Sequence, residues 1–229
     1  MKKEGHPGSY FDGGFWQSLG YDLFVLLLSV VTLGLAYPYA YCKRLRWQFS
    51  HVHISGSQLV FEGKAMEIFS RWLVWLLLTV VTLGIYALFI PTRFMQWLVS
   101  RTHFEGEKDR SSEFSGFVMT YILYFVLGTI ASVISLGLFA SMQKCLMCKW
   151  KWNYSEISGH DVSFLGDWKD LFLKRLKWFL LTLITIGIYG FYSIYLEKVW
   201  IYSQLESKGL LIQNNLREEP LLEDKSIGI

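Results

Sequence analysis

Residues with catalytic or metal-binding chemistry are few in this chain. Cys145 and Cys148 form a CxxC pair, which is a spacing found in zinc and redox sites. A zinc site needs further ligands, however, and no second cysteine pair follows. His160 is the nearest candidate ligand in the sequence. We therefore expect two thiols on one face of a helix rather than a metal centre.

Two further histidines, His51 and His53, alternate along a predicted strand and so share one of its faces. This pattern is compatible with metal binding or pH sensing, but ordinary polar loop residues are the favoured interpretation. The sequence contains no P-loop, G-x-S-x-G or H-E-x-x-H motif. It predicts no enzyme, no cofactor and no metal ion.

Uncharged polar residues recur in a Thr-Leu-Gly element and its variants, four times along the chain. We expect their hydroxyls to bond to the backbone or across helices. The alternative is that they line a path for a neutral or lipid-like solute, near the middle of a membrane. The residues of this candidate midpoint or helix-packing site are Thr32, Gly34, Thr82, Gly84, Tyr86, Ser135, Gly137, Thr185, Gly187 and Tyr189.

The composition indicates an integral membrane protein. Of 229 residues, 52% are hydrophobic and 17% aromatic, whereas 18% are charged, against about 25% in soluble domains. Three cysteines exclude a disulfide framework. The net charge of +3 is small and the basic residues are dispersed, so nucleic acid is not an expected partner.

Four segments carry no Asp, Glu, Lys or Arg. They are residues 23–42, 72–92, 114–143 and 178–196. A helix needs about 20 apolar residues to cross a bilayer, and each segment is about that long or longer. The segments therefore predict four transmembrane helices. Proton-coupled transporters usually hold a charged group inside the membrane, so the absence of one argues against ion-coupled transport.

The chain repeats four times. A Phe-x-Gly triplet at 11–13, 61–63, 114–116 and 164–166 precedes the Gly of each Thr-Leu-Gly element by 21 residues. A Trp follows that second Gly by 13 residues, and a shift of 103 residues superposes the first two units on the last two. We expect an N-terminal tail (1–9), a first two-unit membrane half (10–106), a charged joint (107–112), a second half (113–209) and a polar tail (210–229).

The repeated Trp lies about 20 Å along a helix from its Gly. If the Gly is near the middle of the bilayer, this distance places the Trp among the lipid head groups. The predicted interface anchors are Trp47, Trp97, Trp150, Trp200 and Arg93. Alternating side chains bounded by glycines at 54–63 and 157–166 predict short β-hairpin-like loops between the helices.

The repeated pattern resembles the YjgN-like family of bacterial inner-membrane proteins, which is defined by a domain of unknown function. The clearest copy is Thr82-Leu83-Gly84-Ile85-Tyr86 with Arg93, followed by Thr185-Ile186-Gly187-Ile188-Tyr189. The sequence departs from the pattern at Ser135-Leu136-Gly137-Leu138-Phe139 and at Leu35-Ala36-Tyr37. The resemblance covers roughly residues 10–209. It implies a fold class and a multi-pass location in the bacterial plasma membrane, and it supplies no catalytic residue.

Two topologies compete. In the first, each uncharged segment is one membrane span. In the second, each unit is a re-entrant pair of helices that meet at Thr-Leu-Gly, with all charged loops on one side. Only 10 residues separate Arg71 from Thr82, about 15 Å of helix or half the hydrocarbon core. We therefore expect an all-α polytopic membrane protein with four single spans.

For function, we expect a non-enzymatic membrane module that contacts lipid and organises or assists a membrane-protein partner or forms a homo-oligomer. The first alternative is a channel or transporter for a neutral or lipid-like solute that uses the Thr-Leu-Gly midpoints. A membrane enzyme that acts on lipid through His51, His53 or His160 is the most distant alternative.

Overall fold

The computed structural model describes residue 6, residues 8–135 and residues 137–214. Most of the predicted N-terminal tail (1–5 and 7) and of the predicted polar tail (215–229) lies outside these residues. Residues 208–214 are helical, and of these 210–214 belong to the predicted tail. The repeated region is therefore described almost completely.

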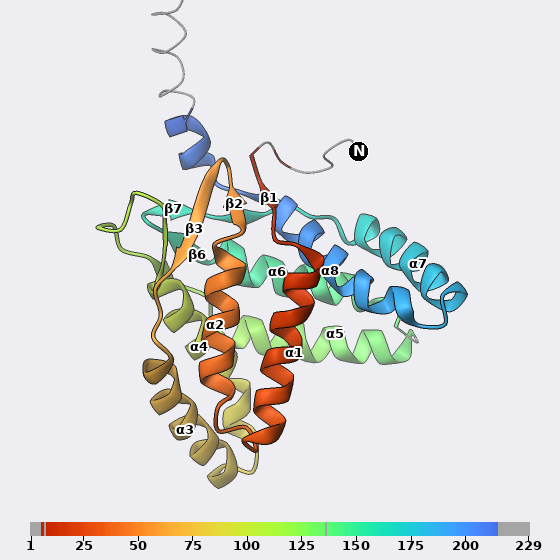
Figure 1. Ribbon diagram of the computed structural model, residues 1–229, viewed down its shortest axis with the longest axis horizontal. Helices are drawn as coiled ribbons and strands as arrows, with labels where there is room; N and C mark the ends of the chain where they lie inside the picture. Colours follow the sequence, from red (N-terminus) through yellow and green to blue (C-terminus); the bar gives the residue numbers. More distant parts are fainter. Residues whose placement is uncertain (1–5, 7, 136, 215–229) are drawn as a thin grey trace, which may run out of the picture.

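Each uncharged segment contains parts of two helices, which are joined by a sharp turn at the Thr-Leu-Gly element or its variant. The chain thus folds into four consecutive helical hairpins (Figure 1). The arms are α1 (Phe15–Val31) and α2 (Tyr37–Phe49), α3 (Ala65–Val81) and α4 (Ile90–Ser100), α5 (Val118–Ile134) and α6 (Ala140–Asn153), and α7 (Trp168–Ile184) and α8 (Ile188–Ser203). A short 3₁₀ helix, η1 (Ile85–Leu88), precedes α4.

The prediction of a polytopic protein with four transmembrane helices is wrong. None of the helices in the described parts of the chain is both long and apolar enough to cross a bilayer. The physical reason is backbone conformation. Leu33 and Gly34 both have positive φ (51° and 86°), which ends α1 and reverses the chain, and the same pair of angles recurs at Leu83 and Gly84 (48° and 91°). Counting uncharged residues could not detect this break.

The structure also contains more strand than the prediction of an all-α fold with hairpin-like loops allowed. The first half forms a four-stranded antiparallel sheet in the order β1-β2-β3-β4, and the second half forms the equivalent set of strands as β5-β6-β7 and β8-β9. The strands are β1 (Tyr10–Phe11), β2 (Val52–Ile54), β3 (Ser57–Phe61), β4 (Thr102–Phe104), β5 (Glu113–Phe114), β6 (Ser155–Ile157), β7 (His160–Asp161), β8 (Ser163–Phe164) and β9 (Leu205–Glu206). A shift of 103 residues relates the two sets, with β7 and β8 together replacing β3.

The turn between β2 and β3 shows why these loops become strands. Ser55 and Gly56 both have positive φ (51° and 89°), as do Ser158 and Gly159 in the second half. Two successive residues of positive φ give the tight turn that matches the twist of an antiparallel hairpin. His53 accordingly pairs with Gln58 in the first half.

The four hairpins are arranged as a closed ring. α2 packs on α3 and α6 on α7, while the two halves meet where α4 contacts β5 and α8 contacts β1. α8 also contacts α1, so the last hairpin returns to the first. In Figure 1 the first two hairpins extend downward and the last two extend to the right, and the strands lie where their bases meet.

The Phe-x-Gly triplet and the repeated Trp form the core of each unit. Phe61 and Trp97 make an edge-to-face contact with ring centroids 5.5 Å apart, and Phe11–Trp47, Phe114–Trp150 and Phe164–Trp200 repeat it. A Cβ at Gly63 would lie 2.2 Å from Cζ of Phe61 and 2.9 Å from Cζ2 of Trp97. The glycine is therefore required for space, not for backbone conformation.

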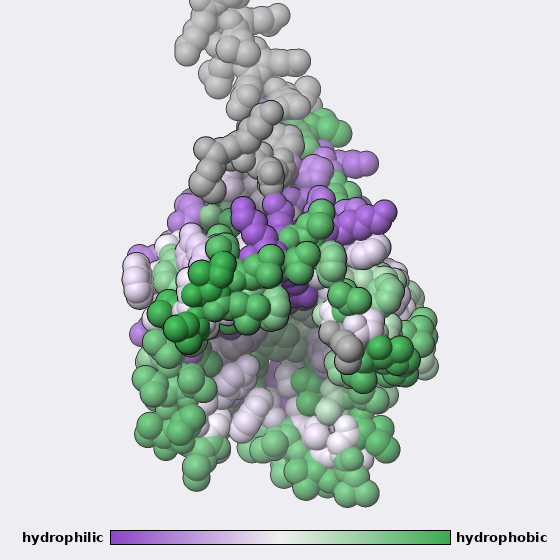
Figure 2. Space-filling model, turned by 90° about the vertical axis from the view of Figure 1, so that its right-hand side faces the viewer, coloured by the Kyte–Doolittle hydropathy of each residue, from purple (hydrophilic) through white to green (hydrophobic). Residues whose placement is uncertain are grey.

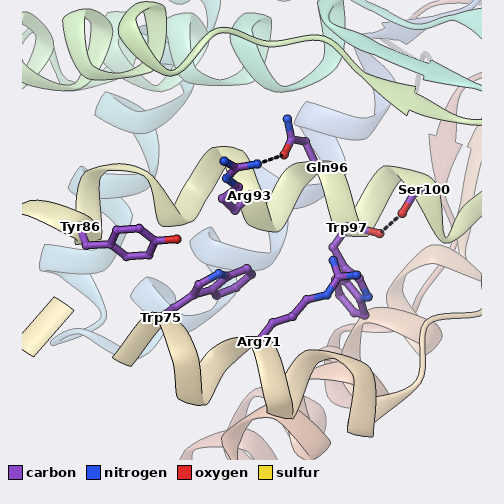
Figure 3. Close-up of a pocket in the computed structure, with 7 residues that line it drawn as sticks. All are labelled: Arg71, Trp75, Tyr86, Arg93, Gln96, Trp97 and Ser100. Atoms are coloured by element: carbon purple, nitrogen blue, oxygen red, sulfur yellow. Dashed lines mark hydrogen bonds between the residues drawn. The ribbon is translucent and has the colours of Figure 1, made fainter. Parts of the chain in front are cut away.

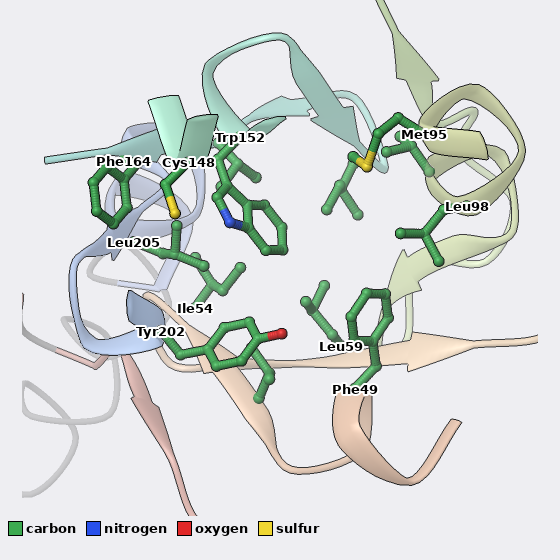
Figure 4. Close-up of a cluster of buried hydrophobic side chains, with 14 of the residues drawn as sticks. Phe49, Ile54, Leu59, Met95, Leu98, Cys148, Trp152, Phe164, Tyr202 and Leu205 are labelled. Atoms are coloured by element: carbon green, nitrogen blue, oxygen red, sulfur yellow. The ribbon is translucent and has the colours of Figure 1, made fainter. Parts of the chain in front are cut away.

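A single apolar cluster joins these units at the bases of the hairpins. It draws Phe49 and Leu59 from the first unit, Leu98 from the second, Trp152 from the third and Tyr202 from the fourth (Figure 4). All five side chains are buried. The hairpin bases thus form the folded core, and the hairpin ends project from it.

Candidate functional site

The ends of the four hairpins, which we call the tips, satisfy their own backbone hydrogen bonds. In the first hairpin the amide of Gly34 donates to the carbonyl of Ser29 at 2.7 Å. Gly84, Gly137 and Gly187 make the same bond to the residue five positions earlier, at 2.7–2.8 Å. This is the Schellman arrangement, which pairs carbonyls that a helix end otherwise leaves open.

The hydroxyl of the Thr-Leu-Gly element completes this pairing. Oγ1 of Thr32 donates to the carbonyl of Leu28 at 2.6 Å and accepts from the amide of Ala36 at 3.0 Å. It therefore joins the end of α1 to the start of α2. The equivalent hydroxyls of Thr82, Ser135 and Thr185 also donate to a backbone carbonyl of the preceding helix. Each of them accepts a hydrogen bond from the backbone amide four residues later, which belongs to Tyr86, Phe139 and Tyr189, respectively.

The side chains at the tips are large, apolar and almost fully exposed. Leu33, Leu83 and Ile186, which occupy the left-handed position of the turn, are 93%, 94% and 94% exposed. A left-handed conformation is uncommon for branched side chains and costs roughly 1–2 kcal/mol. The turns thus hold a bulky apolar side chain outward at the outermost point of the hairpin. The neighbouring exposed side chains are Val30, Val31, Leu35, Val80, Val81, Ile85, Val133, Ile134, Leu138, Leu183, Ile184 and Ile188.

Charged and apolar surfaces are separated along the molecule. Figure 2 shows hydrophilic residues at one end, near the strands, and hydrophobic residues over the hairpins. The boundary lies partway along each arm of the first two hairpins: Asp22 is the last charge before the tip of α1, and Arg71 the last before the tip of α3. Nine residues of α1 and ten of α3 follow, which is about 14–15 Å of helix.

In the first and last hairpins, ion pairs lie at the boundary between the charged and the uncharged part of the arms. Asp22 lies 2.5 Å from Arg44 of the same hairpin and 2.8 Å from Lys198 of α8. Glu197 lies 2.8 Å from Arg175 and 3.3 Å from Lys144. Burial lowers the pKa of Lys198, and Asp22 opposes that shift.

These ion pairs occupy equivalent positions of the repeat with their signs exchanged. Asp22 and Arg175 both follow the Gly of their Phe-x-Gly triplet by nine residues, and Arg44 and Glu197 both follow the second Gly by ten. The first and last hairpins therefore share the pairing at these positions, not the sign of each charge. The search for buried charge in the sequence missed both pairs because their members flank the uncharged segments.

The predicted interface anchors lie in different surroundings. Trp97, Trp150 and Trp200 are buried in the core of their units, and Trp47 is partly buried beside Phe11. Arg93 is exposed. The three buried tryptophans thus contact protein, and their spacing reflects the packing of each hairpin base.

The residues of the predicted midpoint site are brought to the four tips, not to one common cavity. Gly34, Gly84, Gly137 and Gly187 would each accommodate a Cβ without contact, and all have φ of 86–91°. Tyr86 and Tyr189 are partly buried just beyond their turns. The repeated spacing predicted mid-span positions for these residues, and a turn here belongs to the alternative topology of paired helices.

The residues considered for chemistry stay apart. Cys145 and Cys148 are buried free thiols, and burial raises the pKa of Cys145 to about 12. His51 bonds to the carbonyl of Trp47, His53 stacks on Tyr10 and His160 pairs with Glu107 at 3.2 Å. Within the described ranges, no three His, Cys, Asp or Glu side chains are grouped to hold a metal ion.

An aromatic groove separates the first two hairpins. It has a volume of about 470 Å³ and lies in the uncharged part of the arms, between α2, α3 and α4. Tyr41, Trp72, Trp75 and Phe94 provide most of its ring surface. Such a groove is of the size and character that holds apolar ligands, and no motif in the sequence indicated it.

One family model matches the part of the chain that contains the second hairpin. Residues 56–108 match the model of a family described as bacterial protein of unknown function (DUF898). No curated protein and no solved structure matches the chain. The matched segment runs from the turn before β3 to the loop after β4, so it contains the whole second hairpin. Over this segment, the prediction of similarity to a bacterial family of unknown function is confirmed.

Proposed function

We propose that this protein is a non-enzymatic membrane module of a YjgN-like bacterial family, which inserts apolar hairpin tips into one leaflet of a membrane. The charged bases and strands remain in the aqueous phase and are available to a protein partner. In this arrangement the hairpins enter and leave the bilayer on the same side. The proposal thus retains the expected contact with lipid and requires no membrane span.

The observation that carries the proposal is the fourfold tip. Each tip combines exposed Leu, Ile or Val side chains with a turn whose backbone groups are paired internally. Insertion into hydrocarbon requires apolar side chains at the surface and paired backbone groups in the turn, because an unpaired backbone group costs several kcal/mol there. Patches of this kind on a soluble surface promote aggregation or mark an interaction site.

The depth of the uncharged tips fits a single leaflet. The hydrocarbon core is about 30 Å thick, so one leaflet contributes about 15 Å. The uncharged ends of α1 and α3 are about 14–15 Å long. Burying one Leu, Ile or Val side chain stabilises insertion by about 1.5–3 kcal/mol.

The channel or transporter alternative has less support. It requires free polar groups at the Thr-Leu-Gly elements, whereas the hydroxyls of Thr32, Thr82 and Thr185 already bond to the turn backbone. For the alternative of a lipid-acting enzyme, the described part of the chain brings together no group of histidines. We therefore retain the non-enzymatic module.

Co-flotation with vesicles of neutral phosphatidylcholine tests the proposal. The triple variant Leu33→Asp, Leu83→Asp, Ile186→Asp places a carboxylate at three tips, and the cost of about 3 kcal/mol for each inserted Asp should abolish flotation. The folded core should be unaffected because these side chains contact little protein.

The matched control is Trp16→Asp, Met66→Asp, Met119→Asp. These three side chains are also exposed and apolar, but they lie at the base of α1, α3 and α5, at equivalent positions of the repeat. The control should float as the unmodified protein does. Equal loss of flotation in both variants, or no flotation of the unmodified protein, would overturn the proposal.

A further inference from the structure

The second hairpin differs from the other three in the way its arms separate. α1 packs along α2, α5 along α6 and α7 along α8, whereas α3 contacts η1 and makes few contacts with α4. The 3₁₀ segment Ile85–Leu88 delays the start of α4 until Ile90, six residues after Gly84. The other hairpins resume their helix within three residues of the equivalent glycine. This longer turn opens a space between the two arms.

That space is a pocket of about 320 Å³ with mixed polar and aromatic walls (Figure 3). Arg71 and Trp75 come from α3, and Tyr86, Arg93 and Trp97 come from η1 and α4. In Figure 3 the hydroxyl of Tyr86 points into the space between the arms, and Arg71 reaches from α3 toward Trp97. Two arginines, a phenol and two indoles thus line one pocket.

The two arginines are not neutralised by carboxylates. Glu67, one turn before Arg71, is engaged by Arg101 at 3.0 Å and by Nε1 of Trp97 at 3.4 Å. Arg93 contacts the side-chain oxygen of Gln96 at 3.5 Å. Among the residues that the structure describes, neither Arg71 nor Arg93 forms an ion pair. This contrasts with Arg44 and Arg175, which are paired in their own hairpins.

We propose that this pocket binds the phosphate of an anionic phospholipid head group through Arg71 and Arg93. The guanidinium group presents its donors in a fork that fits two phosphate oxygens. The hydroxyl of Tyr86 adds a third donor. Two positive charges in one cavity without an acidic partner favour an anion, and the aromatic walls fit the region where lipid head groups meet acyl chains.

The position of the arginines supports a lipid source for this phosphate and rests on the proposed insertion of the tips. Arg71 and Arg93 directly flank the uncharged segment 72–92. When the tip enters the hydrocarbon, both guanidinium groups lie at its boundary, which is the depth of the lipid phosphates. Trp75 also lines the aromatic groove, so an apolar surface adjoins the polar pocket.

Binding of a short-chain lipid in neutral detergent tests this site without requiring insertion into a bilayer. Dioctanoyl phosphatidylglycerol is titrated into the purified full-length protein in a maltoside detergent, and the heat of binding is measured. We expect one saturable site. Arg71→Gln combined with Arg93→Gln should weaken binding at least tenfold, and Arg71→Lys combined with Arg93→Lys should retain part of it.

The matched control is Lys43→Gln combined with Lys177→Gln. It also removes two positive charges, from exposed lysines that directly flank the uncharged segments of the first and last hairpins. The control should bind the lipid within twofold of the unmodified protein. Thermal unfolding of each variant in the same detergent verifies folding, which these exposed substitutions should preserve.

Three results would overturn the proposed site. They are the absence of saturable binding, equal weakening in the pocket variant and in the control, and equally tight binding of dioctanoyl phosphatidylcholine. Inorganic phosphate is a further competitor. If it displaces the lipid at equal concentration, the pocket is a site for soluble phosphate and the lipid assignment is wrong. None of these results affects flotation with neutral vesicles, so failure of the site and failure of the proposed function are distinguishable.

Discussion

The bases and the tips of the hairpins use the same repeat for opposite purposes. At the bases, Phe61, Gly63 and Trp97 are packed so closely that a single Cβ at the glycine has no room. At the tips, Gly84 has open space around it, and Leu83 beside it is 94% exposed. The comparison shows that four repeated glycines serve packing and four serve chain reversal. One set builds a core, and the other presents apolar side chains outside it.

The strongest test of this comparison is to place the same methyl group at both kinds of glycine. Gly63→Ala should destabilise the protein by about 3 kcal/mol, because the new Cβ overlaps Phe61 and Trp97. Gly84→Ala should cost about 1 kcal/mol, since it meets only the penalty for a positive φ of 91°. Thermal unfolding in neutral detergent measures both. Equal destabilisation would show that the two regions do not differ in packing.

A smaller effect is expected at the boundary between bases and tips. Asp22→Asn leaves Arg44 and Lys198 without their carboxylate, and we expect a loss of about 1–2 kcal/mol from these partly buried charges. Exchanging the pair, as Asp22→Arg with Arg44→Asp, copies the arrangement of Arg175 and Glu197 in the last hairpin.

A double-mutant cycle isolates the pairing energy at this boundary. The exchanged pair should be more stable than the sum of its single variants predicts, by about 1 kcal/mol. Lys198 stays close to the guanidinium group introduced at position 22, and the repulsion between these two positive charges limits this recovery. Purely additive single effects would indicate that the sign exchange between hairpins has no structural meaning.

The smallest effect on stability at neutral pH is expected from the buried cysteine thiols at the bases of the hairpins. Burial raises the pKa of Cys145 from 9.0 to about 12, so the fold favours the neutral thiol. This contribution to stability is complete below pH 9 and is lost as the pH rises from 9 toward 12.

Alkylation with iodoacetamide at about pH 8 measures this protection. It should be slow for Cys145 and Cys148 in the folded protein and fast after unfolding. Rapid labelling of the folded protein would show that the thiols are accessible to solvent. The hairpin base around Cys145 and Cys148 would then not be closely packed, contrary to the comparison of bases and tips.

The sequence predicted the repeat and its period, because these depend on glycines and aromatic residues at fixed spacing, but it placed the Thr-Leu-Gly elements in the middle of single spans. It also predicted the hairpin-like loops, which follow from Ser55-Gly56 and Ser158-Gly159. It did not reveal that Thr32 and its equivalents end a helix. A threonine in an apolar run has no local feature that separates a mid-helix hydroxyl from one that closes a turn.

The tryptophans and the arginine pocket were beyond sequence reasoning for a different reason. Trp97 has the spacing of an interface residue, but the fold turns it toward Phe61, which a linear distance along a helix cannot indicate. Arg71 and Arg93 are 22 positions apart and line one pocket, which the longer turn at η1 opens between the two arms. Both results depend on how the arms are packed.

Probe depth at a tip tests the central claim most directly. The native cysteines are buried, so a nitroxide attached to Leu83→Cys, with Met66→Cys as the reference, reports one position each. In neutral vesicles the account predicts that the probe at residue 83 contacts dissolved oxygen in the hydrocarbon of the near leaflet, while the probe at residue 66 contacts a water-soluble nickel reagent. A probe at residue 83 that the nickel reagent reaches as readily as the one at residue 66 would contradict insertion of the tips.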